Sequence, residues 1–346
     1  MNQPLVCICV PCFNAESTIA ETLETLQAQT YTNIEIHIFD NASTDKTIEI
    51  VSAIVDDRIQ MHQAESTGNA ESNFTRCLNL GRGDYTTIFH ADDLYAPDII
   101  EKEVQFLEKN EGVAGALTFA TQINELGSLG KTYLAPKSLN MKEGEARLFD
   151  VVAIFKAVLE NDNFLFCPSA MIRTRVCVEY IKAWRGEEFK SSADLDVWLR
   201  LAAYNHIALL NAPLLFYRIS DTQWTAGYRK KRKIRSDIFL VLDYWLKNDG
   251  IKQSMANVDM INYQKLQRYD ALACMLNAVR DNEISLAKDI WMREGSFSVA
   301  RELMQIKSSR DMKFFMLSSG LKLMLLPVIG WILRPVFLKY LGKVRL

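Results

Sequence analysis

Apolar and polar residues follow one another in a repeating order along the first part of the chain. A short apolar run at 5–11 precedes a segment, 17–29, in which apolar residues recur at helical spacing. A second apolar run at 34–39 again precedes a helical pattern. This order of strand, helix, strand and helix predicts a parallel sheet whose loops gather at the carboxyl ends of the strands, where open α/β folds bind ligands.

The alternation of predicted strands and helices continues to about residue 119 and then gives way to a mixed and finally a helical pattern. Another strand is predicted at 85–89, a helix begins close to Pro97, and a further strand is predicted around 113–119. A Gly-containing turn at 127–130 indicates a crossing into a second half, and the residues after Ser220 are almost wholly helical. The sequence therefore predicts the α/β class, with two halves of one domain, 1–115 and 116–220, and a helical region, 221–346.

The composition is that of a globular protein. Among 346 residues, 49% are hydrophobic and 24% are charged, which argues against long disordered segments. The seven cysteines show no disulfide framework, and residues 1–13 lack the basic leader and cleavage site of an export signal. We therefore expect residues 1–13 to contain a buried strand and the protein to stay in the reducing cytoplasm.

The charge is unevenly distributed. The formal net charge is -2, but from Arg301 onward nine Lys or Arg stand against two acidic residues, a local excess of +7. Residues 229–235 hold a further six cations, and the uncharged segment 323–333 is well short of the roughly 20 residues needed to cross a bilayer. These features predict that the C-terminal region rests on an anionic membrane surface; the alternatives are a solvated helix start, an intramolecular packing helix or an oligomer contact.

Three polar motifs follow predicted strands. They are Val-Pro-Cys-Phe-Asn-Ala-Glu at 10–16, Asp-Asn-Ala-Ser-Thr-Asp at 40–45 and His-Ala-Asp-Asp at 90–93. In this order and spacing they resemble the inverting family 2 glycosyltransferases of the GT-A fold. The resemblance implies a Rossmann-like, mostly parallel sheet flanked by helices, here with a helical C-terminal extension. It also implies that the first two loops hold a nucleoside and that the acidic pair holds a metal.

The resemblance assigns donor-binding positions. Asp40 stands at the strand end that contacts the base in similar enzymes, and Arg76 is a candidate phosphate contact. For Asp40 the alternative is an Asx turn, for Asn14 and Glu16 a helix cap, and for Arg76 a solvated helical charge. The expected nucleotide-sugar-binding residues are Pro11, Phe13, Asn14, Glu16, Asp40, Asn41, Asn69, Arg76, His90 and Asp92.

Asp92 and Asp93 are the expected ligands of a divalent cation. A departing nucleoside diphosphate develops negative charge, which Mg2+ or Mn2+ held by carboxylate oxygens can offset. His90 stands where these enzymes usually carry the first acidic residue, so it is a candidate for a phosphate or ribose contact or for orienting a ligand. The alternative for Asp92 and Asp93 is an acidic loop that caps the next helix.

The candidate catalytic base lies in residues 191–201, which resemble the acidic segment of the family followed by Trp-Leu-Arg-Leu. An inverting transfer needs one carboxylate to take the proton of the acceptor hydroxyl. On a helix Asp194 and Asp196 are about 200° apart, so they cannot both face the donor. Asp196 can pair with Arg200 at i,i+4, so we assign the base to Asp194. The alternative is that both carboxylates favour a helix N-terminus.

Other segments carry weaker signals. Residues 214–218 resemble the strand that closes the catalytic half, where a His commonly follows two residues later and this chain has Ser220. Residues 166–169 resemble an acceptor-side loop, with a packing turn as the alternative. Cys7 and Cys9 lie on the same strand face without a second pair, so buried small hydrophobic residues are a better interpretation than a metal site.

The sequence therefore favours an inverting, metal-dependent transfer from a nucleotide sugar, with UDP preferred, to a lipid-linked or lipopolysaccharide- or capsule-type glycan at the inner face of the cell membrane. The replacements at His90 and Ser220 support an alternative, a non-catalytic nucleotide-sugar-binding or membrane assembly protein of the same fold. A dinucleotide-dependent oxidoreductase is disfavoured because no Gly-rich turn follows the first strand. Nucleic acid is not an expected partner because the basic run is short.

Overall fold

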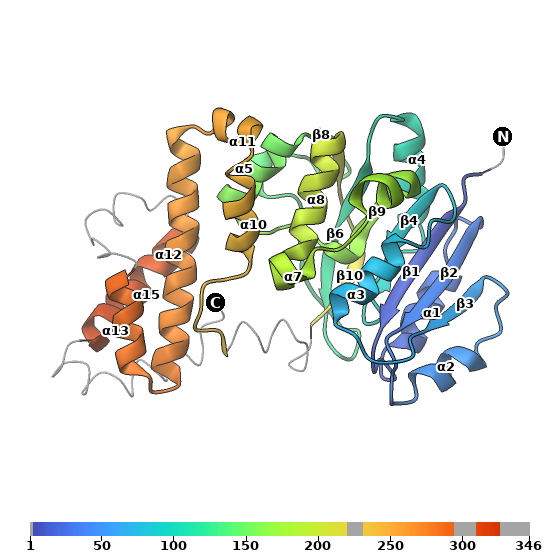
Figure 1. The fold of residues 1–346 in the computed structure, drawn as a ribbon, viewed down its shortest axis with the longest axis horizontal. Helices are drawn as coiled ribbons and strands as arrows, with labels where there is room; N and C mark the ends of the chain where they lie inside the picture. The colour runs from blue at the N-terminus through green and yellow to red at the C-terminus, as the bar shows by residue number, and fades with distance from the viewer. Residues whose placement is uncertain (1–2, 220–230, 294–308, 326–346) are drawn as a thin grey trace. The chain divides into compact units, whose positions relative to one another are not determined.

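The computed structural model describes residues 3–219, 231–293 and 309–325, and its chain divides into two compact units (Figure 1). The first unit comprises 1–220 and 237–255, and the second comprises 221–236 and 256–346. Residues 237–255, which lie in the predicted C-terminal region, thus pack with the first unit.

The first unit is built on one ten-stranded sheet. Its strands are β1 (Val6–Cys12), β2 (Ile34–Asp40), β3 (Ile59–Gln63), β4 (Tyr85–Ile88), β5 (Leu94–Tyr95), β6 (Gly115–Ile123), β7 (Leu129–Thr132), β8 (Ala146–Phe149), β9 (Ala170–Arg173) and β10 (Ile207–Arg218). The order is β3-β2-β1-β4-β9-β6-β10-β5, with β7 beside β6 and β8 beside β10. β3, β2, β1, β4, β6 and β10 run in one direction, while β9 lies antiparallel between β4 and β6.

The helices of the first unit cover both faces of this sheet or, like the last two of them, pack on other helices. They are α1 (Ile19–Gln27), α2 (Thr47–Ala53), α3 (Ala70–Leu78), α4 (Ile99–Lys109), α5 (Val151–Asn161), α6 (Thr174–Val176), α7 (Gly186–Phe189), α8 (Ala193–Tyr204), α10 (Ile238–Trp245) and α11 (Asp249–Ser254). Three short 3-10 helices are η1 (Lys137–Leu139), η2 (Cys167–Ser169) and η4 (Lys190–Ser192), and η3 (Cys177–Ile181) is a short π-helix. In Figure 1, α3 and α8 lie on the face of the sheet nearer the viewer.

The alternation of side chains along β1 explains how the layers form. Val6, Ile8 and Val10 are fully buried in a core shared with the apolar faces of α1 and α4. Cys9 points to the other face, where its thiol donates to the carbonyl of Cys77 in α3 at 3.6 Å. Because both faces of β1 are covered, nearly all of its residues are apolar.

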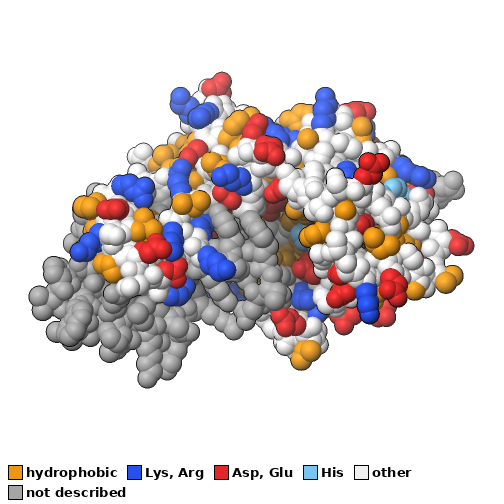
Figure 2. Space-filling model, turned by 60° about the horizontal axis from the view of Figure 1, so that its bottom comes forward, with side chains coloured by type: hydrophobic (Ala, Val, Ile, Leu, Met, Phe, Trp, Pro, Cys, Tyr) orange, Lys and Arg blue, Asp and Glu red, His pale blue; other side chains and the backbone are white. Residues whose placement is uncertain are grey.

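The second unit is helical. α12 (Asn257–Arg280), α13 (Ile284–Arg293) and α15 (Ser309–Leu325) share a small apolar core that includes Met275 and Leu321. Arg232 pairs with Asp270 at 2.5 Å, and the Lys233 ammonium lies within 2.7 Å of two carboxylates. Lys/Arg and Asp/Glu side chains of this unit are intermixed on the face seen in Figure 2. Within the described part of the chain, no helix is long and apolar enough to span a bilayer.

The predicted strands at 5–11, 34–39 and 85–89 are confirmed to within about one residue as β1, β2 and β4. The crossing predicted at 127–130 is wrong, because β7 turns back and pairs antiparallel with β6. The Asn124 side chain accepts hydrogen bonds from the Leu126 and Ser128 N–H groups and so holds this hairpin turn. Ser220 and most of the basic tail lie outside the described residues.

Candidate active site

The loops after β1 and β2 are joined to each other by side chains. Asn14 adopts a φ of 50°, and its amide oxygen accepts from the Thr44 N–H at 2.8 Å. The Glu16 carboxylate accepts from the Lys46 N–H, and the Glu16 N–H donates to Asp45, both at 3.0 Å. Asn14 and Glu16 therefore fix one loop against the other, whatever ligand they contact.

Asp40 and Arg76 meet where β2 ends. The buried Asp40 carboxylate accepts from the Ser43 N–H at 3.1 Å in an Asx turn. The Arg76 guanidinium donates to the carbonyls of Asp40 and His62 at 3.2 and 2.9 Å. Arg76 is therefore held against the ends of β2 and β3 and is not a freely solvated charge.

Three further predicted residues surround the same strand ends. Asn41 makes a two-way contact with the backbone of Gly68, accepting at 3.0 Å and donating at 2.8 Å. Asn69 caps α3 by accepting from the Ser72 N–H at 2.7 Å. Pro11 is paired with Phe39 in the sheet, and the Phe13 ring just beyond it is 48% exposed, so an apolar surface is open at this edge.

His90, Asp92 and Asp93 come together in the loop that follows β4. Each can offer a ligand atom, and these atoms all lie within 4.8 Å of one another. His90 Nδ1 lies 4.0 Å from Asp93 Oδ2. Burial raises the pKa of Asp93 well above its usual range, the nearby Asp92 raises it further, and burial lowers the pKa of His90. The group is a compact set of oxygen and nitrogen donors.

Two buried polar atoms of this group lack hydrogen-bond partners in the part of the chain that the structure describes, and a bound cation would satisfy them. Asp93 Oδ2 and His90 Nε2 are buried and have no hydrogen-bond partner among the described residues. Leaving a buried carboxylate oxygen and an imidazole nitrogen unpaired is unfavourable unless another group satisfies them. The Asp93 and His90 side chains, with the half-buried Asp92 beside them, therefore match the donor set of a divalent cation.

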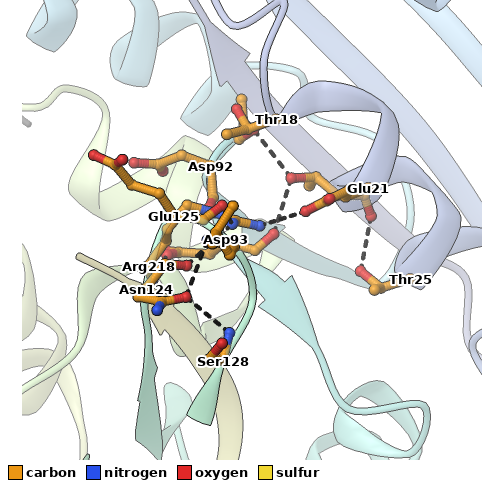
Figure 3. Close-up of polar contacts among 12 residues, drawn as sticks. Thr18, Glu21, Thr25, Asp92, Asp93, Asn124, Glu125, Ser128 and Arg218 are labelled. Carbon is orange, nitrogen blue, oxygen red and sulfur yellow. Dashed lines mark hydrogen bonds and ion pairs between the residues drawn. The ribbon is translucent and has the colours of Figure 1, made fainter. Parts of the chain in front are cut away.

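Arg218, at the end of β10, holds this loop in place (Figure 3). Its N–H donates to Asp93 Oδ1 and its Nε to the carbonyl of Asp92, both at 2.8 Å. The guanidinium also donates to the carbonyls of Asn124 and Glu125 and pairs with Glu21 at 2.6 Å. Arg218 is 3% exposed, so it fixes the acidic loop to α1 and to the β6–β7 turn.

Asp194 lies in the first turn of α8. Burial raises its pKa to about 6, against the opposing hydrogen bonds of the Leu195 N–H and the Asn163 amide. The Cys167 thiol of η2 has its pKa raised by burial and then by the negative charges of Asp194 and Asp93.

Asp196 has a different role from Asp194. It is fully buried and receives hydrogen bonds from Arg185, from Arg200 Nε at 2.8 Å and from Trp245 Nε1 at 3.1 Å. The predicted i,i+4 pair of Asp196 and Arg200 is confirmed. Asp196 therefore joins α8, α10 and the segment before α7 and has no free lone pairs directed at a ligand.

Sequence reasoning placed Cys167 in a candidate acceptor-side loop and Arg218 in the strand that closes the catalytic half, but it assigned neither side chain a role beside the acidic group. The signal for Arg218 was its position at the end of an otherwise apolar strand. A guanidinium buried there needs carboxylates or carbonyls as hydrogen-bond partners, so such groups were to be expected beside it. For Cys167 no local pattern distinguishes a residue near two carboxylates from a packing cysteine.

The fold and the site define a class. A mostly parallel sheet carries polar loops and a cation-fitting acidic group at the carboxyl ends of its strands, as in GT-A nucleotide-sugar transferases. Residues 7–177 match the sequence model of the family described as Glycosyl transferase family 2. The chain belongs to this family and is a glycosyltransferase.

Individual relatives agree with this assignment. The putative glycosyltransferase EpsE of Bacillus subtilis is 28% identical over 207 residues, which are 58% of this chain and 68% of EpsE. The Escherichia coli UDP-Glc:alpha-D-GlcNAc-diphosphoundecaprenol beta-1,3-glucosyltransferase WfaP is 34% identical over 104 residues, 30% of this chain and 41% of WfaP. The structure of the mannosyltransferase PcManGT from Pyrobaculum calidifontis in complex with GDP-Man and Mn2+ covers 98% of this chain and 86% of PcManGT, with a TM-score of 0.51 and 16% identity.

Proposed function

We propose that this protein is an inverting, metal-dependent hexosyltransferase that moves a sugar from a UDP-sugar to a lipid-linked or cell-surface glycan. The observation that carries this proposal is the group formed by His90, Asp92 and Asp93 after β4, whose ligand atoms lie within 4.8 Å of one another. An acidic group able to hold a cation and a second carboxylate able to take a proton are the two requirements of such a transfer.

The donor nucleoside is proposed to lie against the strand ends of β1 and β2. Asp40, Asn41 and Arg76 are held there by hydrogen bonds within the protein, so the surface is pre-formed. The exposed Phe13 ring offers a face for a base. Since the loops need no ordering, binding loses little to conformational entropy.

The donor diphosphate is proposed to lie beside His90, Asp92 and Asp93, which would hold a Mg2+ or Mn2+ ion. When bound, the ion would offset the charge that develops on the departing diphosphate. Arg218 holds the loop that carries these residues, so their positions do not depend on the ligand. The structure of PcManGT, which shares the fold, is a complex with GDP-Man and Mn2+, and this supports the choice of cation.

Asp194 is the proposed base. A carboxylate with a pKa of about 6 is ionised at neutral pH and is more basic than an exposed aspartate. It can therefore take the proton of the acceptor hydroxyl as that oxygen attacks the anomeric carbon from the side opposite the diphosphate. Asp196 cannot replace it, because Asp196 is enclosed by two arginines and a tryptophan.

The acceptor is proposed to be a lipid-linked glycan, as the name of WfaP states for that protein. The excess of +7 over residues 301–346 supports an anionic membrane surface as the place of reaction. Co-flotation of the full chain with vesicles that contain anionic lipid checks this part. Binding to neutral vesicles that equals binding to anionic ones would contradict it.

The decisive experiment is Asp194→Asn, assayed as release of UDP from a panel of UDP-sugars with Mn2+. Turnover is expected to fall by about 100-fold or more, while UDP still raises the melting temperature as in the wild type. Asp57→Asn, at an exposed position after α2, is the control and keeps full turnover. Wild-type protein that binds the donor but never turns it over would instead support a non-catalytic binding protein.

A further inference from the structure

A second group of metal-ligating atoms lies in the sheet, away from the donor loops. Cys7 Sγ is 3.9 Å from Glu35 Oε2, and His37 Nε2 is 3.0 Å from the same oxygen. The ligand atoms of these three residues all lie within 4.8 Å of one another. Cys7 and His37 are fully buried, whereas the Glu35 side chain is 23% exposed. Solvent therefore reaches the group only along Glu35.

The sheet register brings these residues together. Cys7 of β1 is paired with Glu35 of β2, and His37 lies two residues farther along β2, on the same face as Glu35. Sulfur, nitrogen and carboxylate oxygen form a mixed donor set that suits Zn2+ better than Mg2+, Ca2+ or Mn2+. We propose that Cys7, Glu35 and His37 bind a Zn2+ ion through Sγ, one carboxylate oxygen and Nε2.

The observed separations fit such a site with small movements. Zn–S bonds near 2.3 Å and Zn–N and Zn–O bonds near 2.1 Å, at tetrahedral angles, place the ligand atoms about 3.4–3.6 Å apart. The 3.9 Å between Cys7 Sγ and Glu35 Oε2 is slightly longer than this, and the 3.0 Å between Glu35 Oε2 and His37 Nε2 is slightly shorter. Three protein ligands leave a fourth position for water on the side of Glu35.

The surrounding residues orient the ligands. His37 Nδ1 lies 3.0 Å from His62 Nε2, and the His62 ring stacks on Phe39 with a centroid distance of 4.7 Å. Metal-bound imidazoles commonly make such a contact through their second nitrogen, which fixes the tautomer. Arg82 pairs with Glu35 Oε1 at 3.3 Å and leaves Glu35 Oε2 directed at Cys7 and His37.

This site is separate from the proposed donor site. Cys7 and Cys12 are five residues apart on β1, roughly 16 Å at the rise of a strand, and the donor loop begins after Cys12. A cation here would join β1 to β2 and, through His62, to β3. Binding releases the thiol proton of Cys7 to solvent, the proton of the neutral His37 ring resides on Nδ1 beside His62, and no electrons are transferred.

Cobalt substitution tests the proposal because Co2+ bound to a thiolate absorbs in the near ultraviolet, whereas Co2+ bound to oxygen and nitrogen alone does not. Metal-free full-length protein titrated with Co2+ is expected to develop this band at one equivalent, and Zn2+ is expected to abolish it. The band is expected to be lost in Cys7→Ser and retained in Cys9→Ser and Cys12→Ser. Lack of the band in the wild type, or its persistence in Cys7→Ser, overturns the proposal.

Two further variants keep the test decisive if Cys7→Ser does not fold. Glu35→Gln, at a partly exposed position, is expected to weaken Co2+ binding at least 10-fold without loss of the helical circular dichroism signal. His62→Phe is expected to weaken binding about 10- to 100-fold, as for other residues that orient a metal-bound imidazole. Unchanged affinity in both variants would show that Glu35, His37 and His62 form only a hydrogen-bonded chain.

Discussion

The indole N–H of Trp245 donates to Asp196 Oδ1 at 3.1 Å, although the two residues are 49 positions apart. Arg185 and Arg200 approach the same carboxylate, so one buried negative charge is met by two cations and a neutral donor. This arrangement attaches α10 to α8 within the first unit. It also separates the roles of the two aspartates of α8, one of which is structural and one of which is proposed to be catalytic.

Asp196→Asn is expected to destabilise the protein by about 3 kcal/mol, because it removes the counter-charge of the largely buried Arg200 and leaves Arg185 with the longer, 3.7 Å pair to Glu188. Urea denaturation followed by circular dichroism measures this free energy of unfolding. Asp194→Asn is the matched control. Burial raises the folded-state pKa of Asp194, so its ionisation opposes folding above the unfolded pKa, and its removal should not lower stability at pH 7. Equal destabilisation by the two variants would contradict the assigned roles.

The pH dependence of turnover is expected to follow the ionisation of the Asp194 carboxyl group. A base with a pKa of about 6 is protonated below that pH, so kcat/KM is expected to fall about 10-fold for each unit below pH 6 and to be level above it. UDP binding measured by calorimetry over the same range serves as the control. A rate that stays level down to pH 5 while the protein remains folded would place the base elsewhere.

The elements of the fold were predictable where the pattern of apolar and polar residues within one short segment defines them. The strands and the polar loops that follow β1, β2 and β4 are local patterns, and parallel strands bring their carboxyl ends to one edge without further information. The antiparallel insertion of β9 between β4 and β6 was not predictable, because its pairs are 84–88 residues apart with β4 and 53–57 residues apart with β6. The hairpin at Gly127 was missed because a Gly-containing turn does not specify whether the next strand returns or crosses.

The same distinction applies to the site. The separation of Asp194 and Asp196 follows from helix geometry and was available from the sequence. The contacts of Arg218 with Asp92 and Asp93 join residues about 125 positions apart, and the local pattern of apolar and polar residues does not indicate such contacts. The proposed zinc ligands are also non-local, since Cys7 and Glu35 meet only through the register of β1 with β2.

Arg218→Lys should weaken the proposed binding of Mn2+ by His90, Asp92 and Asp93. Lysine keeps the charge, but a single ammonium cannot reproduce the fork that reaches the carbonyls of Asp92 and Asn124 and the carboxylate of Glu21. The Mn2+ concentration for half-maximal turnover is expected to rise about 10- to 100-fold. Arg175→Lys, at an exposed position on α6, is the control and should leave it unchanged. A loss of stability with unchanged Mn2+ dependence would show that Arg218 acts only in folding.

Glu103 in α4 should lower the stability of the folded protein in a pH-dependent way. It is fully buried, and neither carboxyl oxygen has a hydrogen-bond partner among the described residues. Burial raises its pKa well above the usual range, so the folded protein keeps a proton that the unfolded chain loses near pH 4.3. Because the unfolded state then binds fewer protons, the free energy of unfolding falls as pH rises from that point toward the folded-state pKa.

Glu103→Gln removes this titration and is expected to raise the free energy of unfolding relative to wild type. The gain should grow with pH above about 4.3, by up to about 1.4 kcal/mol per unit, until the folded-state carboxyl ionises. Urea denaturation at several values between pH 4.5 and 8 measures the difference, with the exposed Glu111→Gln as a control that should stay within about 0.5 kcal/mol of wild type. A Glu103→Gln gain that does not change with pH would mean that the Glu103 carboxyl is ionised, and therefore paired, in the folded protein.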